Sequence, residues 1–176
     1  MYSFRSVLEE SWVLRAQLSD REVKGQNVML IAARDWASEF AIPYVRHLHG
    51  LAMPASTELL SAASDSPHEL VRVAPTVLDI VLPSPIVGTR FLTSVYRHES
   101  LPFHSGDRVV SPRFDVEVLE VSEGEPKHLR FRFPADLDDP RYVFLYPAGT
   151  GMVRLTMPRV GERSRLPPPA WPSIGP

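Results

Sequence analysis

The stretch RFDVEVLEVSEGEPKHLRFRF, residues 113–133, alternates apolar and polar side chains on both sides of Gly124. A period of two is typical of β-strands that bury one face. A glycine between two such segments is typical of a hairpin turn. The pattern predicts an antiparallel hairpin that buries Phe114, Phe131 and Phe133 and places Glu117 and Glu120 opposite arginines.

Similar alternation continues in both directions from this hairpin. Residues 57–63, 68–74 and 76–82 are predicted as three strands, and residues 88–97 as a short helix. Residues 106–158 are predicted to be antiparallel throughout, as a meander of four or five strands. The chain has 18 prolines, which cannot donate within a central strand, so they punctuate many short strands.

The first fifty residues have a longer period. Residues 2–19 are predicted as an amphipathic helix because Phe4, Leu8 and Trp12 recur every four positions. Residues 27–33, NVMLIAA, form a short apolar run that is consistent with a buried strand.

A second helix is predicted over residues 35–49 and ends at Gly50, which suits the C′ position. Pro43 removes an N–H inside this pattern, so we expect a kink or a break there. The apolar residues of this helix recur every four positions and are expected to face the core; they are Trp36, Phe40, Tyr44 and Leu48.

These elements predict an α+β fold in which N-terminal helices pack on an antiparallel β-sheet, as a small sandwich or a barrel-like meander. Residues 1–166 are expected to form one domain, helix-rich over 1–56 and β-rich over 57–166. Residues 167–176 hold five prolines and are expected to be a tail that packs little against the domain.

Composition narrows the functional classes. The 176 residues are 44% apolar and 23% charged with a net charge of −2, which is typical of a globular protein and argues against a nucleic-acid binder. There is no cysteine, which excludes disulfides, thiolate catalysis and sulfur-ligated zinc. No apolar run reaches the roughly 18 residues of a membrane span, and the first residues lack the core of a signal peptide.

Candidate chemical groups are few. His47 and His49 are two positions apart on the predicted helix, so they cannot share one metal ion there. Asp136, Asp138 and Asp139 lack the spacing of a calcium loop and suit turn chemistry. No nucleophile elbow is present, and the stretch 149–151 is too short for a phosphate loop. We predict no metal and no cofactor, and the sequence assigns no catalytic residue.

Three stretches together resemble a known group of proteins. They are PYVRHLHGLAMPAS (43–56), a discontinuous set of turn and strand residues over 106–145, and PRVGER (158–163). They resemble the soluble C-terminal region of uncharacterised bacterial multi-pass membrane proteins. The resemblance implies a soluble module attached to a membrane anchor, and it implies no activity.

Two functions remain open from the sequence. The favoured one is a non-catalytic interaction module that binds a protein partner. The alternative is a small enzyme or small-molecule-binding domain with a pocket between the helices and the sheet. In that case Arg34, Asp35 and His47 are the first residues to suspect, and Trp12, Trp36, Phe40 and Tyr44 are candidates to line the pocket.

Overall fold

A computed structural model provides the structure of the chain and describes residues 18–33, 37–62, 67–82, 102–148 and 151–168. These residues form two compact units, each built around its own β-sheet. The first unit takes its described residues from 1–63 and 140–156, and the second takes them from 64–139 and 157–168.

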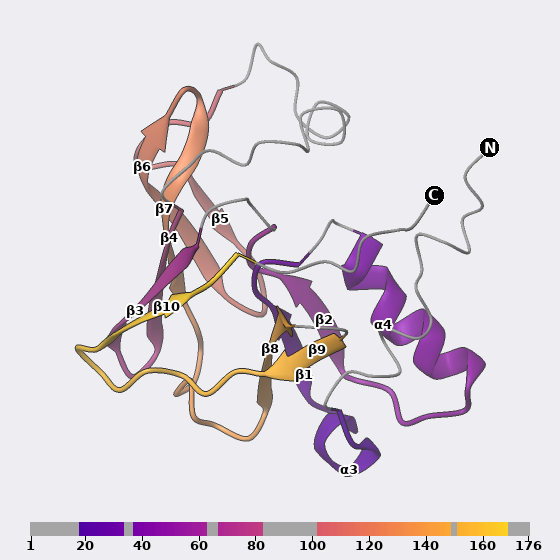
Figure 1. The fold of residues 1–176 in the computed structure, drawn as a ribbon. Helices are drawn as coiled ribbons and strands as arrows, with labels where there is room; N and C mark the ends of the chain where they lie inside the picture. Colours follow the sequence, from indigo (N-terminus) through magenta and orange to yellow (C-terminus); the bar gives the residue numbers. More distant parts are fainter. Residues whose placement is uncertain (1–17, 34–36, 63–66, 83–101, 149–150, 169–176) are drawn as a thin grey trace, which may run out of the picture. The chain divides into compact units, whose positions relative to one another are not determined.

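The sheet of the first unit has four strands in the order β2 (Ser56–Leu59), β1 (Asn27–Leu30), β8 (Tyr142–Ala148) and β9 (Gly151–Arg154) (Figure 1). Strand β1 is parallel to both of its neighbours, whereas β8 and β9 are antiparallel. Because β1 is covered on both faces, three of its four residues are buried, which explains its continuous apolar sequence.

Helix α4 (Ala37–Leu48) connects β1 to β2 and packs against the first sheet. Its residues Ala41, Ile42 and Val45 lie in the same core cluster as Leu30 of β1. The helix runs without interruption through Pro43, so the break allowed for at this residue does not occur. Gly50 has φ +63°, as expected for a helix C′ residue.

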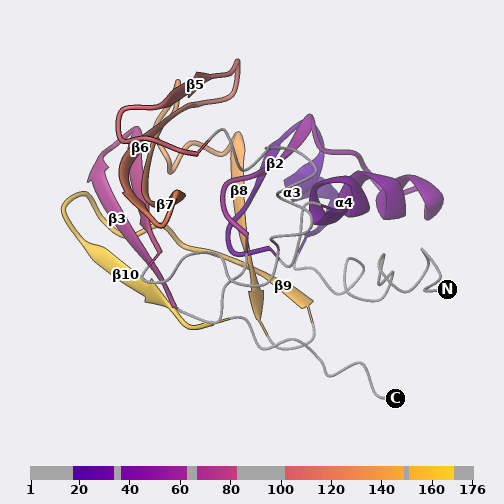
Figure 2. The same ribbon diagram turned by 90° about the horizontal axis from the view of Figure 1, so that it is seen from above.

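The sheet of the second unit has six antiparallel strands (Figure 2). Their order is β10 (Arg163–Leu166), β3 (His68–Ala74), β4 (Val77–Val81), β7 (Glu125–Arg132), β6 (Asp115–Ser122) and β5 (Arg108–Val110). The turn between β6 and β7 has positive φ at Glu123 and Gly124, the geometry that matches the twist of a hairpin. The hairpin predicted from 113–133 is therefore confirmed.

One face of this six-stranded sheet forms the core of the second unit. Phe131 and Phe133 are buried, as predicted, and the ring of Phe114 lies 5.4 Å and 5.8 Å from theirs. Phe114 itself is only half-buried, because it precedes β6 beside the short edge strand β5. Leu78 and Ile80 of β4 complete this face and are fully buried.

The prediction of N-terminal helices packed on an antiparallel sheet is wrong. The described residues form ten strands in two sheets and only two helices, α4 and the four-residue α3 (Asp20–Val23), so the fold is predominantly β. The meander prediction over 106–158 fails at β8, which leaves the antiparallel sheet and pairs in parallel with β1. Local alternation identifies a strand, but it does not identify the partner of that strand.

The other local predictions have separate outcomes. The strands expected within 27–33, 57–63, 68–74 and 76–82 are confirmed as β1, β2, β3 and β4. The helices expected at 2–19 and 88–97, and the packing of the tail, concern residues that lie almost entirely outside the described ranges.

Candidate interaction surface

Helix α4 presents large apolar side chains to solvent. Phe40, Tyr44 and Leu48 are 59%, 51% and 59% exposed, and Met53, just beyond the helix, is 40% exposed. Positions four apart lie on one face of a helix, so the first three form a continuous line that we call the α4 stripe. With Met53, these three are the large apolar side chains that are exposed in the described part of the first unit.

The opposite face of α4 explains why the stripe points outward. Ala41, Ile42 and Val45 are 6%, 0% and 1% exposed and pack against the sheet. The helix therefore has apolar residues on two faces, and the smaller side chains occupy the sheet contact. The prediction that Phe40, Tyr44 and Leu48 face the core is wrong for this reason.

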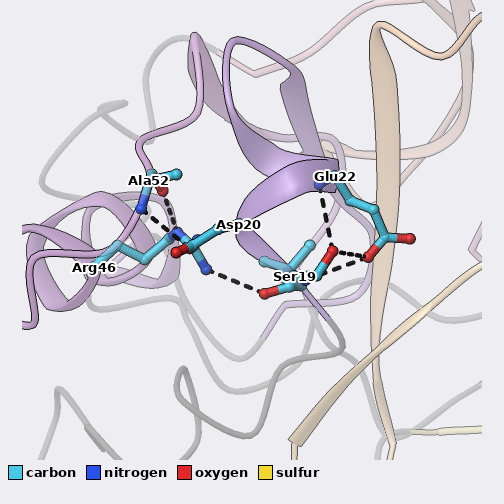
Figure 3. Close-up of polar contacts among 6 residues, drawn as sticks. Ser19, Asp20, Glu22, Arg46 and Ala52 are labelled. Atoms are coloured by element: carbon cyan, nitrogen blue, oxygen red, sulfur yellow. Dashed lines mark hydrogen bonds and ion pairs between the residues drawn. The ribbon is translucent and has the colours of Figure 1, made fainter.

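Arg46 fixes the C-terminal half of α4 (Figure 3). Its side chain is buried and donates from Nε to the carbonyl of Ala52 at 2.6 Å and from Nη2 to the carboxylate of Asp20. Asp20 also accepts from the backbone N–H of Ala52 at 3.1 Å, and Arg46 Nη1 donates to the carbonyl of Leu18 at 3.4 Å. These bonds join α4 to Leu18, to the first residue of α3 and to Ala52, which follows the helix.

The short helix α3 is itself well defined. The hydroxyl of Ser19 accepts from the backbone N–H of Glu22, and the Glu22 carboxylate accepts from the Ser19 backbone in return (Figure 3). This capping box satisfies two N–H groups that a helix start leaves unpaired. Glu22 also forms an ion pair with Arg154 of β9 at 2.6 Å, which ties α3 to the sheet edge.

The polar surroundings of the stripe are sparse. His47 is exposed and lies on the same side of α4 as the stripe, and His49 is exposed just after the helix. The only carboxylate of α4 is Glu39, which is half-buried away from the stripe. Burial and, secondarily, the charge of Glu58 raise the pKa of Glu39 above its usual value.

Three aligned apolar side chains on one helix face differ from the scattered exposed residues of an ordinary surface. Single exposed apolar residues need no explanation, whereas contiguous patches of several hundred Å² mark binding sites. With aromatic side chains of roughly 150–250 Å² each, a stripe that is a little over half exposed offers on the order of 300 Å². This matches the largest apolar patch of an ordinary monomer, about 300–600 Å², which is often a functional site.

The second unit contains the other concentration of titratable groups. Asp79 of β4 is 3% exposed and accepts hydrogen bonds from Arg130 Nε and Nη2, both at 2.8 Å, and from His128 Nε2 at 2.9 Å. Burial opposes ionisation of Asp79, but the bonds from Arg130 and His128 outweigh it and lower its pKa. On the same polar side of the sheet, Glu117 pairs with Arg132 at 2.7 Å.

This cluster does not have the arrangement of a catalytic triad. A histidine oriented by a carboxylate needs a hydroxyl or thiol to activate. Within the described residues, His128 contacts no serine or threonine hydroxyl, and Arg130 engages both oxygens of Asp79. The arrangement is that of ion pairs that join neighbouring strands. Glu117 faces an arginine as predicted, whereas Glu120 contacts Lys127 at 3.0 Å instead.

The acidic residues of the 136–139 turn have a structural partner. Arg72 of β3 is 4% exposed and binds Asp136 at 2.7 Å and Asp138 at 2.8 Å. The backbone N–H of Asp138 also donates to the Asp136 carboxylate at 2.9 Å, which is turn chemistry. A guanidinium therefore occupies the position beside these carboxylates where a cation would bind.

Of the residues first suspected of chemistry, only His47 lies within the described residues. Arg34 and Asp35, together with Trp12 and Trp36, lie outside the described residues. Just before them, Ala32 is buried with φ +53° and donates its N–H to the Ser61 hydroxyl at 2.9 Å, which turns the chain at the end of β1. His47 lies on the surface of α4, away from the core cluster of the first unit.

Metal ligands and membrane spans are absent from the described ranges. Across 18–33, 37–62, 67–82, 102–148 and 151–168, no three histidine, aspartate or glutamate side chains come together as a metal site. None of the helices in those ranges has the length and apolar character needed to cross a bilayer. No protein-family model, curated protein or solved structure matches the chain.

Proposed function

We propose that this protein is a non-catalytic interaction module that binds a partner protein through the α4 stripe. The observation that carries the proposal is the exposure of Tyr44 and Leu48 by more than half on a helix whose other face is fully packed. A rigid helix with aligned apolar anchors is a common way to present a surface to a partner. We also propose that the module belongs to a bacterial membrane protein, which the resemblance to the soluble C-terminal regions of such proteins supports.

The alternative, a small enzyme or small-molecule binder, has less support from the described residues. Three buried charged side chains are engaged in ion pairs: Arg46 with Asp20, Arg72 with Asp136 and Asp138, and Asp79 with Arg130. Groups held in this way stabilise the fold and are not poised to react with a substrate.

The test compares three forms of the purified full chain as bait in extracts of cells that express the natural protein. The forms are the unchanged chain, a stripe variant with Tyr44→Ser and Leu48→Ser, and a control with Val73→Ser and Val160→Ser. The control removes two apolar residues that are 42% and 51% exposed in the second unit. Any protein lost only by the stripe variant is then purified and titrated against all three forms by calorimetry.

The proposal predicts one protein that binds the unchanged chain and the control equally and the stripe variant at least about tenfold more weakly, which corresponds to 1.4 kcal/mol. Binding that survives in the stripe variant but is lost in the control would assign the interaction to another surface. Turnover of a small substrate by the unchanged chain would favour the enzyme alternative.

A further inference from the structure

Strand β5 lies at the end of the six-stranded sheet, and among the described residues β6 is its one strand partner (Figure 2). Two hydrogen bonds fix how these strands pair. The N–H of Val118 donates to the carbonyl of Asp107 at 2.8 Å, and the N–H of Ser111 donates to the carbonyl of Phe114 at 3.1 Å. Bonded and non-bonded pairs alternate along an antiparallel ladder, so the backbone of Val109, midway between Asp107 and Ser111, also bonds to β6.

The backbone groups of the two residues beside Val109 point the other way. Arg108 and Val110 occupy the non-bonded positions of the ladder, so their N–H and C=O groups face the open edge of the sheet. The side chains along this edge are accessible, since Val109 and Val110 are 64% and 71% exposed. The strand contains no proline or lysine, two residues that protect edge strands from further pairing. An extended peptide can therefore add here as another strand.

The core face of the sheet indicates an apolar residue in the added strand. Val109 begins a row of apolar residues that crosses the sheet and continues through Val116 of β6, Phe131 of β7 and Leu78 of β4. Phe131 and Leu78 are buried and Val116 is half-buried, whereas Val109 is mostly exposed. The row is thus covered in the middle of the sheet and unfinished at β5. An apolar side chain opposite Val109 would extend it, at a non-bonded position where cross-strand side chains lie closest.

The other face of the sheet indicates an acidic residue. A second row across the same strands holds Arg108, Glu117, Arg130 and Asp79, and the charges alternate in sign. Arg108 pairs with Asp115 at 2.5 Å, yet its side chain remains 52% exposed at the edge. Opposite charges directly across neighbouring strands stabilise a sheet, so a carboxylate suits the position opposite Arg108 in an added strand.

We propose that the open edge of β5 binds an extended segment of a partner protein by strand addition. The segment has an acidic residue opposite Arg108 and apolar residues opposite Val109 and Val110. A second copy of β5 suits this edge less well, because the strand itself offers no carboxylate to Arg108. The inference concerns the second unit alone and does not depend on the α4 stripe.

The test uses the purified 176-residue chain labelled with nitrogen-15 and three capped synthetic peptides. The first peptide, STEVVETS, has the same sequence in both directions, so it offers glutamate and valine to β5 in a parallel or an antiparallel orientation. The second, STKVVKTS, replaces both glutamates by lysine. The third keeps the first sequence but carries N-methyl groups on its four central residues, which removes their N–H donors.

Strand addition predicts that the glutamate peptide shifts the amide signals of Arg108 and Val110. We expect it to bind at least about tenfold more tightly than the methylated peptide, because the methylated peptide loses its backbone hydrogen bonds. We expect a preference of about threefold or more over the lysine peptide, because the charge opposite Arg108 is reversed. Arg108→Glu should invert this preference.

A matched pair of proline variants locates the binding edge. Val110→Pro removes an outward N–H and no bond to β6, and edge strands tolerate proline at such a position. The control, Arg165→Pro, does the same on β10 at the other edge, because the N–H of Arg72 donates to the carbonyl of Glu162 and Arg165 is therefore at a non-bonded position. Val110→Pro should weaken binding of the glutamate peptide at least about tenfold, and the control should leave it unchanged.

Three results would overturn the inference. The first is no shift of the Arg108 and Val110 signals at millimolar peptide, and the second is equal binding of the three peptides. The third is loss of binding in the Arg165→Pro control with none in Val110→Pro, which would assign the peptide to β10. A dimer of the unchanged chain that Val110→Pro dissociates would replace the inference by pairing between two copies.

Discussion

Replacement of Arg72 by methionine tests the main polar contact of the second unit. The guanidinium, 4% exposed, donates to Asp138 at 2.8 Å, to Asp136 at 2.7 Å and to the carbonyls of Pro158 at 3.2 Å and Pro75 at 3.4 Å. Methionine keeps much of the apolar stem but removes all four bonds. The change therefore separates the charge from the packing of the side chain.

The expected loss of stability depends on how well each hydrogen-bond partner of Arg72 is satisfied once the guanidinium is removed. Removal of one member of a buried ion pair costs roughly 3–5 kcal/mol when the other member remains buried. Asp136 and Asp138 are 50% and 69% exposed, so water can replace the lost donor. The carbonyl of Pro75 still accepts a hydrogen bond from the N–H of Leu137 at 2.9 Å. The carbonyl of Pro158 loses the hydrogen bond that Arg72 donates to it. We therefore expect the free energy of unfolding to fall by about 3 kcal/mol, the lower end of this range.

The assay is urea unfolding followed by far-ultraviolet circular dichroism, together with a thermal melt. A loss of 3 kcal/mol corresponds to a fall in Tm of about 6–12 °C for a chain of this size. The matched control is Arg163→Met, which breaks an exposed pair with Glu69 at 2.7 Å and is expected to cost less than about 1 kcal/mol. Equal effects of the two changes would falsify the assignment of Arg72 as a structural centre of the second unit.

Five further substitutions have expected outcomes in the same unfolding assay. Phe131→Ala should cost about 3–5 kcal/mol because the ring is buried, and a loss below 1 kcal/mol would contradict this. Ile42→Ala should cost about 2–5 kcal/mol, whereas Leu48→Ala on the exposed side of α4 should cost far less. The pKa of Asp79 is lowered, so its stabilising effect is present above about pH 4 and is lost on acidification; Asp79→Asn should flatten the acid side of the stability profile. The pKa of Glu39 is raised, so its stabilising effect is present at low pH and is lost as the pH rises; Glu39→Gln should raise the urea midpoint at pH 7 and leave it unchanged below about pH 4.

The strands of the second unit could be predicted because their evidence is local. Each of β3, β4, β6 and β7 alternates within its own residues, and the turn at Gly124 places two of them side by side. The destination of β8 could not be predicted, because its partner β1 lies more than a hundred residues earlier. An apolar run such as YVFLY fits either sheet, and only the assembled core selects one.

For a related reason, the sequence could not show which face of α4 packs against the sheet. Phe40, Tyr44 and Leu48 form the more obvious apolar line, yet the contact with the sheet uses Ala41, Ile42 and Val45. A second apolar line beside the first was the available signal that one of them would stay outside. No local pattern indicates that Arg46 would be buried by Asp20, since such pairing depends on residues brought together by the fold.

The path of the chain between the two sheets affects how the protein can be assembled during its synthesis. Strands β1 and β2 emerge early from the ribosome, but β8, which completes the other side of β1, follows only after residues 64–139 of the second unit. Strands β3 to β7 are contiguous in the chain apart from one long connection, so their sheet can close without waiting for later residues, except for the edge strand β10. Because non-local pairing is slow, the hydrogen-bonding edge of β1 that β8 occupies stays unpaired while the ribosome adds more than a hundred residues. Because an unpaired strand edge can pair with another chain, β1 is the strand of the first sheet whose pairing is exposed to aggregation for the longest stretch of synthesis.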